Sequence, residues 1–138
     1  MKSLNLIAIA CLVSLLGCFS DSGQPLHPVS GTVTRGGQPV EHVVVQFQPS
    51  TGRPSFGRTD VDGRYTLHYT HQFSGALIGD HQVGLRVPSV APDEISDFAN
   101  LDPEQQDVAL KMEMVPVSSR LEVVEGNNTF DFELDNLP

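Results

Sequence analysis

The chain has 138 residues, with 17 Asp and Glu against 8 Lys and Arg, and a formal net charge of −9 at pH 7. This length predicts a single folded domain. The acidic balance excludes nucleic acid and anionic lipid headgroups as electrostatic partners, and it favours solubility, divalent cations or basic partners.

The N-terminal segment resembles a bacterial export signal. Lys2 supplies a minimal positive charge, and the mainly apolar run at 4–16 is shorter than the roughly 20 residues that a membrane-spanning helix needs. The stretch Leu15-Leu16-Gly17-Cys18 resembles the lipobox of bacterial lipoproteins. This resemblance implies cleavage before Cys18, diacylation of its sulfur and acylation of the new amino terminus. The alternative is a plain secretory signal with a chance cysteine.

The lipobox divides the chain into a signal peptide at 1–17, a lipidated tether at 18–27 and a domain at 28–138. Several acyl chains on one residue anchor a protein firmly, because each buried methylene contributes about 0.8 kcal/mol. In bacterial lipoproteins, Asp directly after the lipidated cysteine is the known signal for retention in the inner membrane. Here Phe19 follows Cys18, so the resemblance favours the outer membrane over the inner one. The other cysteine lies in the cleaved segment, so no structural disulfide is expected.

After the tether, alternating apolar and polar residues predict an all-β domain. Gly36-Gly37 predicts a tight turn after the first strand. In the second strand, Val43, Val45 and Phe47 are expected to face inward and Val44 outward. The expected strands cover residues 29–34, 40–48, 56–59, 64–69, 80–87, 119–125 and 129–134. Seven short strands with frequent turns predict a β-sandwich.

Asp60-Val61-Asp62-Gly63 joins two of these strands and has two interpretations. Asp side chains accept hydrogen bonds from nearby backbone amides and Gly takes a positive φ, which together favour a tight turn. Two carboxylates one residue apart also begin many Ca²⁺ loops, but the rest of an EF-hand pattern is missing. The turn is the favoured interpretation. Asp60 and Asp62 remain weak metal candidates, and weakly bound Ca²⁺ is the only cofactor considered.

The stretch at 88–108 interrupts the alternation. It holds three prolines, and residues 93–113 contain seven acidic side chains against one Lys. Helical turns at 94–99 or 104–112 are conceivable, although neither has an apolar stripe. A loop this long is either functional or mobile, and the sequence favours mobility. The part of it at 93–107 could also hold Ca²⁺ weakly.

Several motifs in order resemble the carboxypeptidase regulatory-like domain. They include Val29-Ser30-Gly31-Thr32-Val33, Gly37-Gln38-Pro39-Val40, Thr59-Asp60-x-Asp62-Gly63-x-Tyr65 and the closing Phe130-x-Phe132-x-Leu134, and the match covers 29–134. The version common in small planctomycete lipoproteins is similar. The resemblance implies a transthyretin-like (prealbumin-like) Greek-key sandwich. In carboxypeptidases this module is an accessory without activity of its own.

Enzymes of the same fold family suggest two further tests. Dioxygenases hold iron with two Tyr and two His, but Tyr65 and Tyr69 are expected on the inward face and His68 on the other. The C-terminal Tyr-Arg-Gly-Ser motif of the related hydrolases is missing. Each of the five histidines is expected at the surface of a strand or turn, so no metal cluster is predicted.

The leading hypothesis is a non-enzymatic, lipid-anchored protein of the bacterial cell envelope. Its sandwich would serve adhesion, scaffolding or contact with envelope proteins or glycans. The second hypothesis is a carbohydrate- or calcium-binding accessory module. Sandwiches commonly bind sugars through exposed aromatic side chains, but the chain has no Trp, and Phe56 and Phe73 are the only aromatics expected in loops, which counts against this hypothesis. A hydrolase or dioxygenase is the third.

Overall fold

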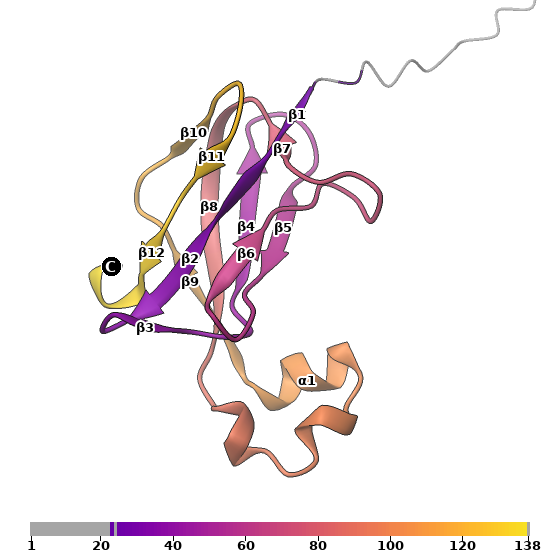
Figure 1. Cartoon of the computed structure of the whole chain (residues 1–138), viewed down its shortest axis with the longest axis vertical. Coiled ribbons are helices and arrows are strands. Elements are labelled where there is room, and N and C mark those ends of the chain that lie inside the picture. Colours follow the sequence, from indigo (N-terminus) through magenta and orange to yellow (C-terminus); the bar gives the residue numbers. More distant parts are fainter. Residues whose placement is uncertain (1–22, 24, 138) are drawn as a thin grey trace, which may run out of the picture.

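The computed structural model describes residue 23 and residues 25–137 (Figure 1). Cys18, the expected signal peptide and most of the expected tether lie outside the described residues. The strands are β1 (Leu26–His27), β2 (Val29–Arg35), β3 (Gln38–Pro39), β4 (Val44–Pro49), β5 (Ser55–Arg58), β6 (Arg64–Thr66), β7 (Ala76–Leu77), β8 (Gly79–Pro88), β9 (Met112–Pro116), β10 (Leu121–Val123), β11 (Asn128–Thr129) and β12 (Phe132–Glu133). The helix α1 (Pro103–Ala109) and the 3-10 turns Pro92–Glu94, Phe98–Asn100 and Leu134–Asn136 complete the elements.

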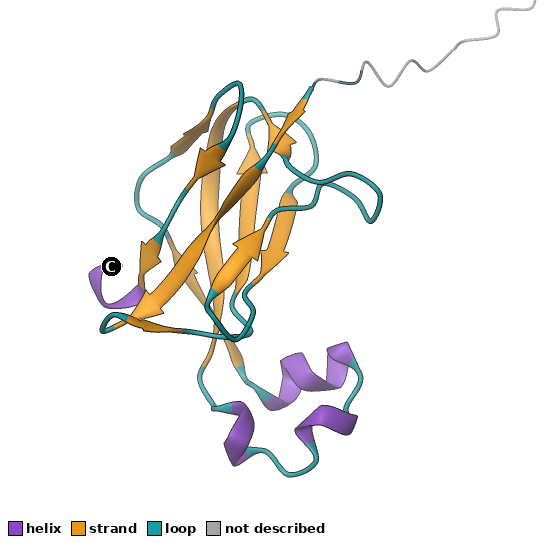
Figure 2. Cartoon of the chain, viewed as in Figure 1, coloured by secondary structure: helices purple, strands orange, loops and turns teal. Residues whose placement is uncertain are grey.

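The strands form two main sheets that pack against each other (Figure 2). In the first sheet the order is β10-β8-β4-β5, and β9 pairs with the same side of β8 as β10, farther along the strand. In the second sheet β2 is central and pairs with β3, β6, β11 and β12. The small pair β1-β7 lies at one end. Strands account for 44% of the structure and helices for 14%, so the expected all-β class is confirmed.

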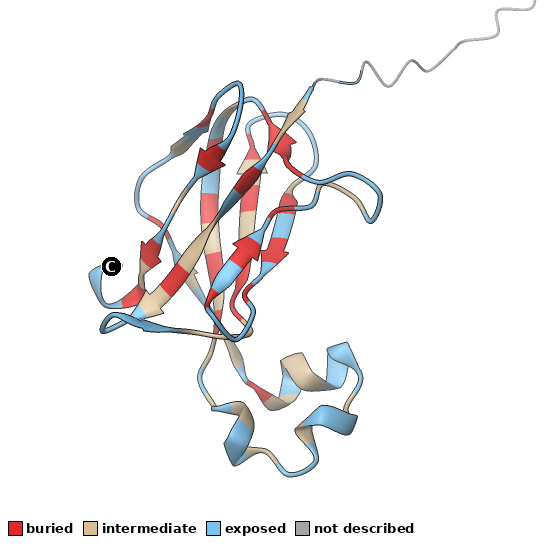
Figure 3. Cartoon of the chain, viewed as in Figure 1, coloured by how far each residue is buried: buried red, intermediate tan, exposed pale blue. Residues whose placement is uncertain are grey.

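The core lies between the two sheets (Figure 3). Val43, Val45 and Phe47 of the β4 region are fully buried there, as the alternation predicts. From the second sheet, β2 contributes Val29 and Val33, which are also fully buried. Burial of this apolar surface from both sheets is the main force that holds the domain together.

Several expected strands are shorter in the structure: the one expected at 64–69 ends at Thr66, and the one expected at 119–125 covers only Leu121–Val123. The strand expected at 40–48 begins only at Val44, because the chain turns at His42, whose φ is 64°. Val44, expected to face outward, is buried with 6% exposure. Its cross-strand partners Arg58 and Arg86 lie on either side of it on the outer face of the sheet.

The N-terminal and C-terminal segments also differ from expectation. Leu26–His27, expected in the tether, forms β1 and pairs with β7. The strand expected at 129–134 is divided into β11 and β12, and both run parallel to β2. The break between them lies beside Gly31, where an added Cβ would come 1.8 Å from the Phe130 carbonyl oxygen. The close approach therefore requires a glycine.

The segment at 89–111, here called the helical excursion, leaves the sandwich after β8 and returns as β9. Where the sequence favours a mobile loop, the structure has two 3-10 turns and α1, followed by an unexpected strand, β9. Asp102 begins α1 with a capping box, in which its side chain accepts from the Gln105 amide and the Gln105 side chain accepts from the Asp102 amide. This cap satisfies amides that a short helix leaves free. Helix formation here depends on the cap more than on an apolar stripe.

Candidate functional site

The turn at Asp60–Gly63 is held by its own backbone. Asp60 Oδ1 accepts hydrogen bonds from the amides of Asp62 and Arg64, both at 2.9 Å. Gly63 has φ of 70°, and its carbonyl oxygen accepts from the amide of Val33 at 2.8 Å. An added Cβ at Gly63 would come 2.6 Å from the Val33 carbonyl oxygen. The geometry accounts for Asp60 and Gly63 as residues of a turn docked on β2.

The described residues contain no group of three or more His, Cys, Asp or Glu side chains placed to hold a metal ion. Asp60 and Asp62 are neighbours in the turn, but the fold brings no third such ligand to them. Both are exposed. Calcium binding at this turn therefore stays a prediction that needs its own experiment.

The histidines do not come together, and one prediction about them is wrong. His81 is 1% exposed, because it shares the inward face of β8 with Val83 and Leu85. Its Nε2 lies 2.8 Å from the Leu77 carbonyl oxygen, and its Nδ1 has no partner among the described residues. Its ring lies 5.7 Å from that of Phe47. His81 is a core residue and not a surface one.

The two tyrosines occupy different environments. The Tyr65 hydroxyl donates to the Phe130 carbonyl oxygen at 2.6 Å. Burial, with a smaller contribution from the nearby Asp131, raises the pKa of Tyr65 far above its ordinary value of 10.0. Tyr69 lies beyond the end of β6 and is half-buried, with the Arg53 guanidinium 5.5 Å from its ring centre. Tyr65 thus acts as a neutral hydrogen-bond donor that joins β6 to the C-terminal segment.

Glu133 has a structural role that the sequence did not reveal. Its carboxylate accepts hydrogen bonds from the amides of Gly36 and Gly37, at 2.8 and 3.1 Å, and from the Thr34 hydroxyl at 2.9 Å. The Gly37 amide is the largest cause of a lowered pKa for Glu133, and the Thr34 hydroxyl is the next. The carboxylate thereby ties β12 to the β2–β3 hairpin.

The outer face of the first sheet carries side chains that point away from the core. Arg86 is the cross-strand partner of both Val44 and Met114, and Arg58 lies on the other side of Val44. These residues therefore form one row across β9, β8, β4 and β5. In the row, the two guanidinium groups flank an apolar centre.

A shallow hollow lies in this face, here called the Val44 hollow. It has a volume of about 380 Å³ and is lined by Val44, Phe56, Gly57, Arg58, His68 and Arg86. Phe56 is 41% exposed. His68 Nδ1 lies 3.1 Å from the Ser74 hydroxyl, and the ring is on the exposed side of the strand, as the alternation predicts. The hollow combines an apolar floor, an aromatic ring and two guanidinium groups.

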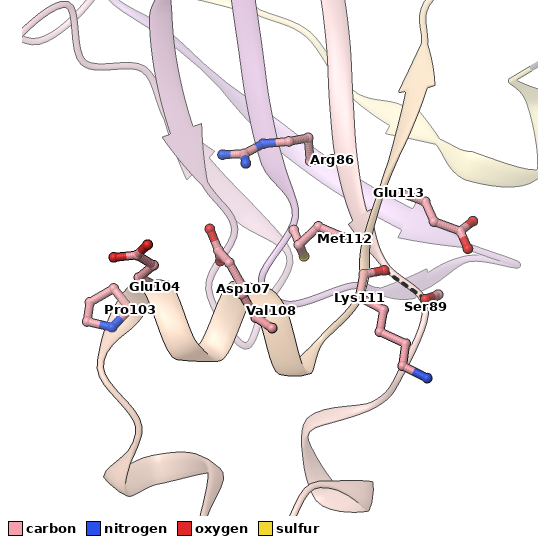
Figure 4. Close-up of a pocket in the computed structure, with 9 residues that line it drawn as sticks. All are labelled: Arg86, Ser89, Pro103, Glu104, Asp107, Val108, Lys111, Met112 and Glu113. Atoms are coloured by element: carbon pink, nitrogen blue, oxygen red, sulfur yellow. Dashed lines mark hydrogen bonds between the residues drawn. The ribbon is translucent and has the colours of Figure 1, made fainter.

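A second opening, of about 730 Å³, separates the outer face from α1 (Figure 4). Arg86 extends over it from the sheet, while Asp107 points from α1 toward the sheet (Figure 4). Asp107 also binds Arg58 at 2.6 Å. Because Glu104 and Glu113 line the same opening, its electrostatic character is mixed. Arg86 belongs to both openings and is the residue that connects them.

Sequence reasoning missed Arg58 and Arg86 because they are 28 positions apart and isolated in the sequence. Their pairing with Val44 depends on strand register, which alternation alone does not give.

Among the described residues, none of the helices has the length and apolar character that crossing a bilayer requires.

The fold defines an all-β protein with two packed sheets, and the outer face of one sheet is its candidate binding surface. Comparisons with protein-family models, curated proteins and solved structures found no match to this chain.

Proposed function

We propose that the chain is a non-enzymatic, lipid-anchored protein of the bacterial cell envelope, with the outer membrane as its favoured location. Its sandwich, taken as a seven-stranded Greek-key domain of the transthyretin-like kind, would serve adhesion, scaffolding or protein interaction. The anchor would be the acylated Cys18, at the lipobox-like Leu15-Leu16-Gly17-Cys18. The resemblance to a regulatory-like accessory domain supports the non-enzymatic role.

The observation that carries this proposal is the arrangement of the two ends of the sandwich. β1, which follows the N-terminal segment, lies at one end of the long axis, and the helical excursion lies at the other (Figure 1). A lipid on the N-terminal side would therefore hold the β1 end toward the membrane. The excursion and the adjacent part of the outer face would then point away from the lipid, where a partner has access.

The strongest catalytic and metal candidates are engaged in folding contacts. Asp60 Oδ1 accepts two backbone amides, and the Tyr65 hydroxyl is bonded to the Phe130 carbonyl oxygen. These contacts give each residue a structural reason for its presence. They support a binding role over a catalytic one.

Metabolic labelling with a palmitate analogue, followed by fractionation of the envelope, tests the anchor. The wild type is expected to carry label and to sediment with membranes, while Cys18→Ala is expected to lose the label and be released. Cys11→Ala is the matched control, because it removes the other cysteine, from the segment expected to be cleaved. An unlabelled wild type, or a Cys18→Ala variant that remains with the membranes, would contradict the anchor.

The second candidate function is a carbohydrate- or calcium-binding accessory module. The Val44 hollow, with the exposed ring of Phe56, favours the carbohydrate form. The calcium form is tested by thermal unfolding in millimolar Ca²⁺ and in EDTA, because a ligand that binds only the folded state raises the midpoint. A rise that persists in the Asp60→Asn/Asp62→Asn double variant would place the cation elsewhere.

A further inference from the structure

We propose that the Val44 hollow is a binding site for an acidic glycan, one that carries uronic-acid carboxylates. The carboxylates would bind Arg86 and Arg58, and a sugar ring would pack against Phe56. This inference deepens the proposed envelope function, on which it rests for its setting, by naming the class of partner.

The first support is the local charge, which is opposite to that of the whole chain. The chain has a formal net charge of −9, yet the lining of the hollow includes Arg58, Arg86 and His68 and no Asp or Glu. Arg64 lines an adjoining hollow together with Arg58, His68 and one carboxylate, Asp60. Elsewhere the acidic surface repels a polyanion. An anionic ligand would therefore favour the Val44 hollow over the opening beside α1, which Glu104, Asp107 and Glu113 line together with Arg86.

The second support is the state of the two guanidinium groups. Arg58 is bound to Asp107, whereas no carboxylate among the described residues lies within ion-pair distance of Arg86. Arg86 is half-buried, which lowers the dielectric around its charge. A guanidinium in this position can bind a carboxylate through two parallel hydrogen bonds. Arg86 is the principal anchor, and Arg58 is the secondary one.

The third support is the apolar part of the lining. Val44 forms a floor that is 6% exposed, and the ring of Phe56 beside it is 41% exposed. A ring next to an apolar floor offers a surface for the C–H face of a sugar. A volume of about 380 Å³ lies at the small end of the range for ligand sites. The site would therefore hold one or two sugar units of a longer chain.

The position of the hollow within the sheet favours a glycan over an acidic peptide. β4 pairs with β5 on one side and β8 on the other, and at the outer edge of β5 both main-chain groups of Phe56 are bonded to His68, so these groups are already used. A peptide that binds by strand addition needs a free edge. A ligand here must bind through side chains alone. Arg58 and Arg86 lie on strands two spacings apart, about 10 Å, which is comparable to the length of a disaccharide unit.

Titration calorimetry on the full chain, purified in a mild detergent, tests the site. The probes are hexagalacturonate, neutral maltohexaose and hexaglutamate. Hexagalacturonate is expected to bind more tightly than either of the others, and its affinity is expected to fall as salt is added. Equal binding of maltohexaose would overturn the role of charge. Equal binding of hexaglutamate would overturn the choice of a glycan, and no binding of hexagalacturonate would overturn the site.

Matched variants locate the binding. Arg86→Ala is expected to weaken hexagalacturonate binding about 10-fold, the usual effect of losing a charged hydrogen bond. Phe56→Ala is expected to weaken it about fivefold. Arg120→Ala and Phe73→Ala remove the same side-chain types from exposed loops outside the hollow, and neither is expected to change the affinity. Losses of equal size in these controls would contradict the assignment to the hollow.

Two further measurements separate a failure of the glycan site from a failure of folding and from a failure of the lipid anchor. Arg86→Lys retains the charge but not the paired hydrogen bonds, and an intermediate loss of affinity is expected even if Arg86→Ala fails to fold. Lipid labelling is independent of the binding assay. Glycan binding without label would remove the anchor and leave the site in place, whereas label without glycan binding would overturn this inference and leave the anchor in place.

Discussion

The sandwich and the helical excursion are stabilised by different kinds of contact. In the sandwich, side chains from both sheets are fully buried against one another. In the excursion, Leu110 is the one residue of 89–111 classed as buried. The rest is held by the Asp102 cap, by hydrogen bonds such as that from Ser89 to the Lys111 carbonyl oxygen, and by the Arg58–Asp107 pair. With so little apolar burial, the excursion is expected to open locally at a lower free energy than the sandwich.

The largest expected effect is that of a cavity in the sandwich. Phe47 is fully buried and contacts the rings of both His81 and Phe130. Phe47→Ala is expected to reduce the free energy of unfolding by about 3–5 kcal/mol, measured by urea unfolding. Phe73→Ala, at a position that is 58% exposed, is the control and is expected to change it by less than about 0.5 kcal/mol. A small effect at Phe47 would contradict the common core.

Removing the buried leucine of the excursion is expected to have a smaller and more local effect. Leu110→Ala leaves a cavity where the excursion joins the sandwich, at a cost of about 2 kcal/mol. Amide hydrogen exchange in α1 is then expected to accelerate about 30-fold, with little change in β4 and β8. Val108→Ala, on α1 at 75% exposure, is the control. Equal acceleration in β4 would show that the two regions unfold as one unit.

The smallest expected effect concerns pH and the carboxylate of Glu133. Because hydrogen bonds from the Gly37 amide and the Thr34 hydroxyl lower the pKa of Glu133 below 4.5 in the folded state, its ionised form favours folding. This stabilisation is present above the ordinary pKa and is lost as the pH falls through the folded value. Glu133→Gln is therefore expected to flatten the decline of the melting temperature below pH 4.5.

Circular dichroism of thermal unfolding across this pH range measures the effect at Glu133. Glu125→Gln, in the exposed loop after β10, removes one carboxyl away from the β2–β3 hairpin and is the control. If the two variants follow the same pH profile, the hydrogen bonds to Glu133 have no measurable part in acid stability.

Alternation in the sequence predicted the sandwich interior because burial on one face of a strand has a period of two residues. Val83, Leu85 and Val87 are buried as expected. The same period of two places His81 on the inward face. The prediction of a surface position was wrong because it gave more weight to the polar character of histidine than to its place in the alternation. The Gly36-Gly37 turn was also predictable, because glycine readily adopts the positive φ that a tight turn needs. Both residues have positive φ in the structure.

Features that depend on contacts distant in sequence were not predictable. Burial of Val44 requires arginines from β5 and β8 to lie on either side of it. β9 has Glu113 and Met114 exposed, so its sequence gives no alternation, and it is a strand because β8 offers an unpaired edge. The outer face was missed for the same reason. Its residues become neighbours only through strand register.

The parallel pairing of β2 with β11 and β12 has a consequence for the timing of folding. Val33 of β2 is paired with Phe132, and the Thr32 amide donates to Asp131 across 99 positions of sequence. Contacts of such long range slow folding, because the entropy of closing a long loop of chain must be lost before they form. In a growing chain, β2 cannot form all of its strand pairings until Phe132 has left the ribosome. The domain would therefore remain incompletely folded until its last strand, β12, has been synthesised.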